Sequence, residues 1–172
     1  TINAAVDEIK ARLKLERINL AGQSGGSTVA AGLLALGRKD IGCAALASGG
    51  FDMPDIVTRA RAKARQGSAD VEREKSQLSE YFFDVLGATP RVAASADRKI
   101  YVLADPKDQR TPFDQQKRYA DTMNAAGHNA VVLAANGRGK ENHGLTHMAI
   151  EISGLCSSGK SEATVRRAIS AN

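Results

Sequence analysis

Short, mostly apolar runs alternate with longer amphipathic segments along this chain of 172 residues. The apolar runs are bounded by polar or glycine-rich stretches and predict strands over 17–21, 41–47, 99–104 and 129–134. Apolar residues at helical spacing predict helices over 3–14, 25–36, 113–126, 145–156 and 162–169. Because strands alternate with helices, the pattern predicts an α/β fold with three layers (α/β/α), a mostly parallel sheet and right-handed crossovers.

Composition narrows the classes of protein to consider. Apolar residues make up 42% of the chain and charged residues 25%, as in an ordinary globular domain. No apolar run approaches the roughly 20 residues needed to cross a bilayer, so no membrane span is expected. The net charge of +5 does not predict nucleic-acid binding, because basic and acidic residues are mixed in one segment and aromatic residues are only 4%. The residues of that mixed segment are Arg59, Arg61, Lys63, Arg65, Asp70, Glu72, Arg73, Glu74 and Lys75.

Ser24 is the first candidate for chemistry. It stands in the sequence Gly22-Gln23-Ser24-Gly25-Gly26, between a predicted strand and a predicted helix. A G-x-S-x-G turn between strand and helix exposes a serine as a nucleophile, and its glycines are expected to remove Cβ atoms that would collide there. The N-terminus of the following helix favours developing negative charge, and the backbone N–H of Gly25 is the predicted oxyanion donor. The bare pattern is weak, and its alternative is a glycine-rich turn that binds phosphate or only joins the two elements.

An acid and a histidine follow later in the chain. The strand over 99–104 runs into a polar loop with Asp105 and Asp108, and the strand over 129–134 runs into a glycine-rich loop that contains His143. Each candidate thus follows the carboxyl end of a strand, the edge at which ligands and catalytic groups gather in open α/β sheets. The chain order Ser, Asp, His is the order expected of an α/β-hydrolase.

The stretch from about Arg17 to Leu145 resembles the C-terminal half of an α/β-hydrolase catalytic domain, most closely the prolyl oligopeptidase and dipeptidyl aminopeptidase branch. The segments that carry the resemblance are Gly22–Gly26, Thr89–Val92, Asp108–Phe113, Ala126–His128 and His143–Leu145. The family acid typically precedes x-x-(Val/Thr)-Pro, which points to Asp108 rather than Asp105. The family pair His-Gly at the end of the preceding strand is replaced here by Leu103-Ala104.

The resemblance and the chemistry together imply a serine hydrolase that cleaves an ester or peptide substrate through an acyl-enzyme. Ser24 would attack the carbonyl, His143 would accept its proton, and Asp108 would hold the imidazole and stabilise the imidazolium. No cofactor is implied. The alternative is a non-catalytic domain of the same fold that binds a ligand or partner.

Other residues compete for these roles. Asp105 could be the acid instead of Asp108, with capping of its loop as its alternative role. Asp52 and Asp55 follow the strand over 41–47 and are weaker candidates. His147 lies four residues after His143, so the two would share a helix face. A metal site on that pair is not expected, because no third ligand has suitable spacing.

The remaining polar and sulfur residues give weaker signals. His128 is expected in a turn ahead of a strand. Cys43 is expected as a core residue, and a disulfide between Cys43 and Cys156 is neither indicated nor excluded, which leaves the cellular compartment open.

The organisation predicted is a single domain over 1–172 with a charged, mostly helical insertion over about 52–88. Hydrolases place lids at this position, and Tyr81, Phe82 and Phe83 could line the pocket beneath one, although such a cluster is more often core. The pattern of elements resembles a hydrolase from its middle onward, so we expect a fragment, whose partner could be the N-terminal half of the same protein or a second copy. The alternative is a complete small domain that has dispensed with the preceding strands.

Overall fold

The computed structural model describes residues 1–57, 85–89, 95, 97–139 and 141–170. Its strands form one sheet in the order β1-β2-β3-β4, and each of the three pairings is parallel. The predicted parallel sheet is therefore confirmed. The strands are Ile18–Gln23 (β1), Ile41–Ala47 (β2), Lys99–Ala104 (β3) and Asn129–Ala134 (β4).

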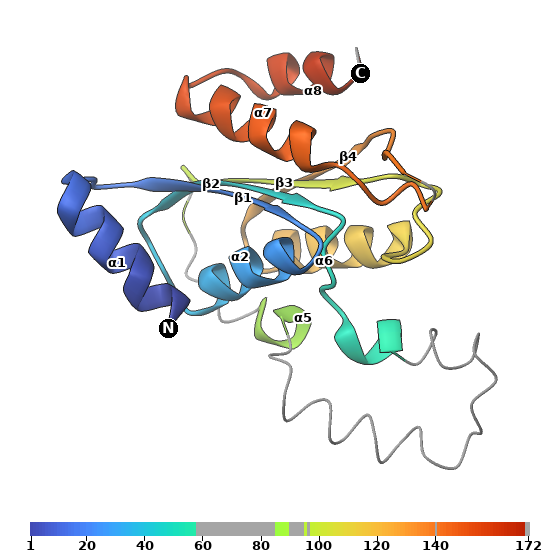
Figure 1. Cartoon of the computed structure of the whole chain (residues 1–172), viewed down its shortest axis with the longest axis horizontal. Helices are drawn as coiled ribbons and strands as arrows, with labels where there is room; N and C mark the ends of the chain where they lie inside the picture. The colour runs from blue at the N-terminus through green and yellow to red at the C-terminus, as the bar shows by residue number, and fades with distance from the viewer. Residues whose placement is uncertain (58–84, 90–94, 96, 140, 171–172) are drawn as a thin grey trace.

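Helices cover both faces of this sheet, which gives the predicted three layers (Figure 1). Helices α2 and α6 lie on one face, and helices α7 and α8 lie on the other. The helices are Ile2–Leu13 (α1), Gly25–Ala35 (α2), Val85–Ala88 (α5), Phe113–Ala125 (α6), Thr146–Ser157 (α7) and Glu162–Ser170 (α8). Each of the helices and strands predicted outside 52–88 is found, and β1 runs two residues further than predicted, through Gln23.

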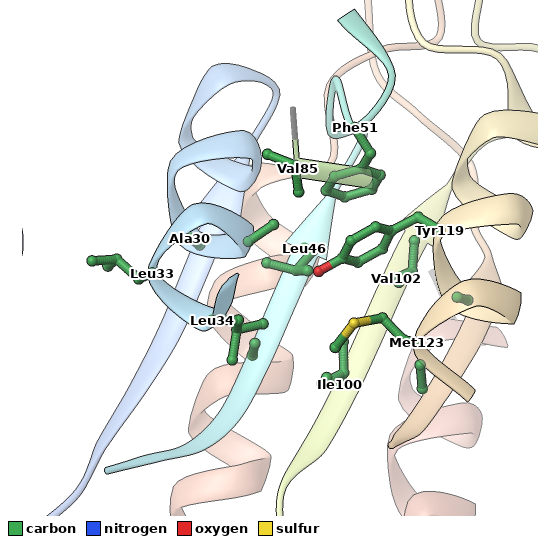
Figure 2. Packing of buried hydrophobic residues seen from close by; sticks show 14 of the residues in the cluster. Ala30, Leu33, Leu34, Leu46, Phe51, Val85, Ile100, Val102, Tyr119 and Met123 are labelled. Atoms are coloured by element: carbon green, nitrogen blue, oxygen red, sulfur yellow. The ribbon is translucent and has the colours of Figure 1, made fainter. Parts of the chain in front are cut away.

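Side chains that alternate along the central strands build two apolar layers. Ile100 and Val102 of β3 pack with α2 and α6, whereas Tyr101 and Leu103 pack with α7 and α8. This period of two is the consequence of the pleat, which sends successive side chains to opposite faces. Figure 2 shows the first layer, where the ring of Tyr119 stacks on Phe51 with 4.0 Å between centroids.

A cluster of charged side chains ties α1 to the segment ahead of β2. The Arg38 guanidinium lies 2.8 Å from Asp7 and 2.6 Å from Asp40, and Lys10 pairs with the same Asp40 carboxylate. The hydrogen bond from Arg38, opposed by burial and helped by Lys10, holds the pKa of Asp40 well below its ordinary value. This cluster fixes α1 against the body of the domain.

A disulfide joins Cys43 of β2 to Cys156 of α7, with 6.2 Å between their Cα atoms. The sequence left this pair open, because the two cysteines are 113 residues apart and only the packing of α7 on the sheet brings them together. The link fastens α7, the helix that follows the His143 loop, to the centre of the sheet.

Most of the predicted insertion, including Tyr81, Phe82 and Phe83, lies outside the described residues. At its two ends, residues 53–57 and α5 are helical. None of the helices in the described ranges combines the length and apolar character needed to span a membrane.

Candidate active site

The carboxyl ends of all four strands meet at one edge of the sheet. The register places Gln23 beside Ala47, Ala47 beside Leu103, and Leu103 beside Leu133. Ser24 and the loops that carry Asp108 and His143 leave the sheet at this edge. The predicted candidates therefore gather where parallel sheets place their ligands.

Ser24 alone turns the chain from β1 into α2. Its backbone has φ 55° and ψ −122°, in a region that L-residues seldom occupy. Its N–H donates to the carbonyl of Ala47 at 2.8 Å, and its own carbonyl accepts from Ser27 N–H at 2.9 Å and Thr28 N–H at 3.2 Å. Neighbouring backbone thus holds the strained residue in place, and the residue remains partly exposed.

Gly22 makes this sharp turn sterically feasible. A Cβ atom on Gly22 would lie 2.6 Å from both the carbonyl carbon and the oxygen of Gly26, and 2.7 Å from the nitrogen of Ser27. A Cβ atom on Gly26 would meet nothing within 4 Å outside its own helix and chain neighbours. The expectation that both glycines prevent a collision is therefore correct for Gly22 and wrong for Gly26, whose backbone is the surface that Gly22 approaches.

Gly25 begins α2 immediately after the serine. The first N–H groups of a helix have no partner within the helix, and the helix dipole places partial positive charge there. The Gly25 N–H therefore lies in the part of the turn that favours an anion next to Ser24.

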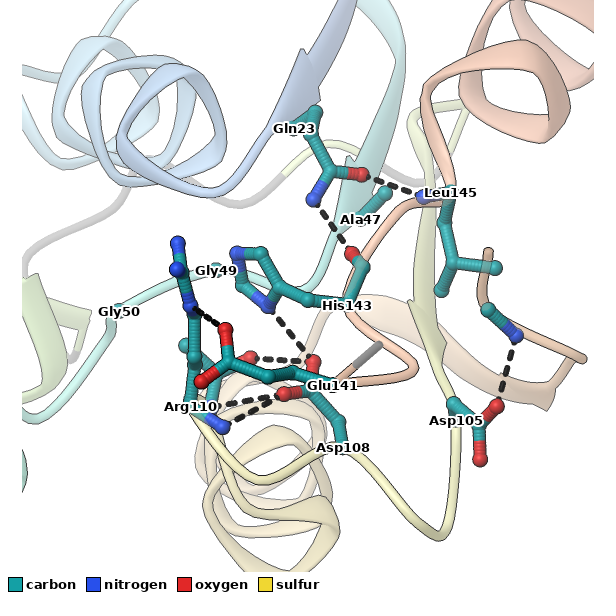
Figure 3. Close-up of polar contacts among 12 residues, drawn as sticks. Gln23, Ala47, Gly49, Gly50, Asp105, Asp108, Arg110, Glu141, His143 and Leu145 are labelled. Carbon is teal, nitrogen blue, oxygen red and sulfur yellow. Dashed lines mark hydrogen bonds and ion pairs between the residues drawn. The ribbon is translucent and has the colours of Figure 1, made fainter. Parts of the chain in front are cut away.

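Asp108 lies in the loop between β3 and α6, where its side chain is fully buried. One carboxylate oxygen accepts from the N–H groups of Arg110 at 2.8 Å and Thr111 at 3.1 Å. The other accepts from the Thr111 hydroxyl at 2.9 Å and contacts His143 Nδ1 at 2.8 Å (Figure 3). Burial alone raises the pKa of Asp108, but the bonds from Thr111, His143 and Arg110 outweigh it and hold that pKa below its ordinary value.

The contact with Asp108 settles the orientation of the His143 ring. An ionised carboxylate only accepts hydrogen bonds, so Nδ1 carries the proton, and Nε2 of the neutral ring is the free acceptor. Nε2 is buried and has no hydrogen-bond partner among the described residues. Within that same part of the chain, no hydrogen bond joins His143 to the Ser24 hydroxyl. Such contacts are often long in enzymes without substrate and shorten when substrate binds.

The competing acids have other partners. Asp105 accepts from the N–H of Lys107 and from the N–H of Gly137, each at 2.7 Å, so it joins the loops after β3 and β4. This bonding matches the loop-capping role. Asp52 and Asp55 lie 3.4 Å and 3.7 Å from the Arg118 guanidinium, on the α6 side of the sheet.

The other histidines lie apart from the Asp108 contact. His147 is in the first turn of α7, and His128 is a buried residue that follows the turn at Ala126 and Gly127 and directly precedes β4. In the described ranges, no group of three or more His, Cys, Asp or Glu residues is arranged to hold a metal ion.

Two side chains of the site were not singled out by the sequence. Thr111 contacts the Asp108 carboxylate through both its N–H and its hydroxyl. Gln23 contacts the backbone on both sides of the His143–Leu145 segment. Thr111 stands in the x-x-(Val/Thr)-Pro motif that pointed to Asp108, and the role of its hydroxyl could have been noticed from its place three residues after an acid, a spacing at which side chains cap turns. Gln23 gave no such signal, because its partners lie more than a hundred residues away.

The sheet, its flanking helices and the likeness to solved structures define an α/β-hydrolase fold. The esterase Pf2001 of Pyrococcus furiosus matches 98% of this chain with a TM-score of 0.61 and 16% identity. The acylaminoacyl peptidase of Pyrococcus horikoshii matches 75% of the chain with a TM-score of 0.56 and 16% identity. This chain spans 60% of the esterase and 21% of the peptidase. No protein-family model and no curated protein sequence matches it.

Proposed function

We propose that this chain carries the catalytic triad of a serine hydrolase, with Ser24 as nucleophile, His143 as general base and Asp108 as the orienting acid. The observation that carries the proposal is the buried contact of 2.8 Å between Asp108 and His143 Nδ1, which leaves Nε2 as a free acceptor. The positive φ of Ser24 at a strand–helix turn supports it, because this is the geometry of a nucleophile elbow.

The steps follow from these groups. Ser24 Oγ attacks the carbonyl carbon of an ester or peptide while its proton passes to Nε2 of His143. The carbonyl oxygen becomes an oxyanion, for which the Gly25 N–H is the donor next to the nucleophile. The imidazolium, stabilised by Asp108, gives its proton to the leaving oxygen or nitrogen, and an acyl group remains on Ser24. Water then attacks this acyl group by the same proton transfers and releases the acid.

The substrate is a small ester or peptide. The esterase and the peptidase that share this fold are named for these two classes of bond, and both are attacked through the same acyl-enzyme chemistry. We propose further that the segment over 52–88 is an insertion that shapes the pocket for the substrate. It lies between β2 and β3 in the sequence, and it follows the carboxyl end of β2, which is at the same edge of the sheet as Ser24.

The test is covalent labelling by a fluorophosphonate, which reacts with an activated serine. We expect labelling at Ser24 and none in Ser24→Ala. His143→Gln should lower the labelling rate by about 10³-fold or more, and Asp108→Asn by a comparable factor, because the residues of a triad act as a unit.

His147→Gln is the matched control, since it makes the same substitution four residues away. It should label at the wild-type rate. A folded wild-type protein whose Ser24 never labels would contradict the proposal and favour a non-catalytic binding domain. Equal loss of labelling in His147→Gln and His143→Gln would contradict the assignment of the base.

A further inference from the structure

The loop that carries His143 must cross the whole width of the sheet. It leaves β4 at Ala134 and enters α7, which packs on β1 and β2. β4 and β1 are the opposite edges of the sheet, roughly 14 Å apart at the usual strand spacing. The position of His143 relative to Ser24 therefore depends on what holds the far end of this loop.

Asp residues fix the loop on the β3 side of the site. Asp105 binds the N–H of Gly137 near the start of the loop, and Asp108 binds the His143 ring itself. The ion pair between Arg110 and Glu141 adds a third contact on this side. None of these contacts reaches β1, where Ser24 follows the strand.

The side chain of Gln23 supplies the contact on the β1 side. Its Nε2 donates to the carbonyl of His143 at 2.7 Å, and its Oε1 accepts from the N–H of Leu145 at 2.8 Å (Figure 3). Both the nitrogen and the oxygen of the amide thus form hydrogen bonds, one with the backbone of His143 and one with the backbone of Leu145. Gln23 immediately precedes Ser24, so one side chain connects the turn that holds the serine with the loop that holds the histidine.

We propose that Gln23 is a positioning residue, which sets the approach of the His143 imidazole to Ser24 by holding the loop against the end of β1. This inference rests on the proposed function. Without Gln23, the loop keeps its contacts with Asp105 and Asp108, and the disulfide still fastens α7 to β2, but the His143–Leu145 backbone between these points can shift. The ring then keeps its tautomer while Nε2 moves away from the hydroxyl whose proton it accepts.

Two substitutions separate this role from a general contribution to folding. Gln23→Met has a similar length and removes both hydrogen bonds. Gln23→Glu keeps an acceptor for the Leu145 N–H but places a carboxylate oxygen against the His143 carbonyl. Gln109→Met is the matched control, because Gln109 is an exposed glutamine next to Asp108 whose side chain makes no hydrogen bond with any described residue.

The readouts are the fluorophosphonate labelling rate of Ser24 and the hydrogen-exchange rate of the Leu145 amide by NMR, in variants shown to be folded by circular dichroism. In Gln23→Met, we expect labelling to fall about 100-fold, the loss associated with a misplacement of about 1 Å. The Leu145 amide should exchange roughly tenfold faster, as expected for the loss of a hydrogen bond. The fall in labelling should lie in the maximal rate of inactivation, with the half-saturating probe concentration unchanged.

Gln23→Glu should show a pattern that a merely structural role does not predict. The Leu145 amide stays protected, yet labelling falls about tenfold because the His143 carbonyl is repelled. Gln109→Met should match the wild type in both measurements. Wild-type labelling in Gln23→Met overturns the inference, as does an equal loss in Gln109→Met.

Failure of the proposed function gives a different result. If Ser24 of the wild type never labels, the hydrolase assignment fails. The hydrogen-exchange measurement by itself then tests whether Gln23 holds the loop. Slow exchange of Leu145 in the wild type and fast exchange in Gln23→Met then supports the placement of the loop by Gln23. Equal exchange in the two proteins overturns it.

Discussion

Replacement of Gly22 by alanine tests the geometry of the turn at Ser24 directly. The added Cβ would lie 2.6 Å from backbone atoms of Gly26, whereas ordinary contacts begin at 3.4 Å, so strand and helix must separate by about 0.8 Å. The atoms in the way are backbone and cannot rotate aside. Overpacking of this kind costs about 1–3 kcal/mol, and we expect the free energy of unfolding to fall by an amount in that range.

The same separation displaces Ser24, which lies midway between the two glycines. Because a misplacement of about 1 Å can cost on the order of 100-fold in rate, labelling of Ser24 should fall about 10- to 100-fold in Gly22→Ala. Both effects are measured on one preparation, by urea unfolding and by the fluorophosphonate rate.

Gly26→Ala is the control, since its Cβ meets open space. Alanine is favoured over glycine in a helix by up to about 1 kcal/mol, so this variant should be as stable as the wild type or more stable. Its labelling rate should stay within about threefold of the wild-type rate. Equal urea midpoints and equal labelling for Gly22→Ala and the wild type would refute the steric reasoning, and so would a similar loss in both alanine variants.

Three further predictions concern stability. The Tyr119 hydroxyl is buried with no hydrogen-bond partner among the described residues, so Tyr119→Phe should raise the free energy of unfolding by about 1 kcal/mol; a loss in urea unfolding would contradict this. Replacing Cys43 and Cys156 by alanine opens a loop of 113 residues and should lower that free energy by about 2–5 kcal/mol, an effect that a reductant reproduces in the wild type and not in the variant. Asp40 has a pKa lowered chiefly by its hydrogen bond from Arg38, so it stabilises the fold above about pH 4 and loses this contribution as the pH falls towards its folded-state pKa. At pH 7, the free energy of unfolding of Asp40→Asn should therefore be about 1–2 kcal/mol lower than that of the wild type, and this difference should narrow below pH 4. A difference independent of pH would contradict the argument.

Local patterns in the sequence determined most of the fold. The apolar runs of β2 and β3 are buried on both faces, and a strand with two buried faces is apolar at nearly every position. The helical spacing of α6 and α7 and the turn residues between elements are equally local, so the alternation of strands and helices, and with it the parallel sheet, could be predicted.

The candidate site could be predicted in part for the same reason. Residues that follow the carboxyl ends of parallel strands must meet at one edge, so Ser24, an acid after β3 and His143 could be proposed from chain order. Strand ends and chain order did not separate Asp105 from Asp108, because both follow β3 by a few residues, and only the x-x-(Val/Thr)-Pro motif of the resemblance pointed to Asp108. The choice depends on which carboxylate the His143 ring contacts, and only the folded loop shows that contact.

Tertiary structure alone decided the contacts between distant segments. The amide of Gln23 binds His143 and Leu145, and Cys43 pairs with Cys156, across separations of more than a hundred residues. A hydrogen bond or a disulfide needs two groups at a defined distance and angle, and no local pattern encodes both partners. The open space at Gly26 and the collision at Gly22 likewise depend on how closely a helix packs on a strand. Local periodicity thus determined which elements form, and the packing of those elements decided which side chains touch.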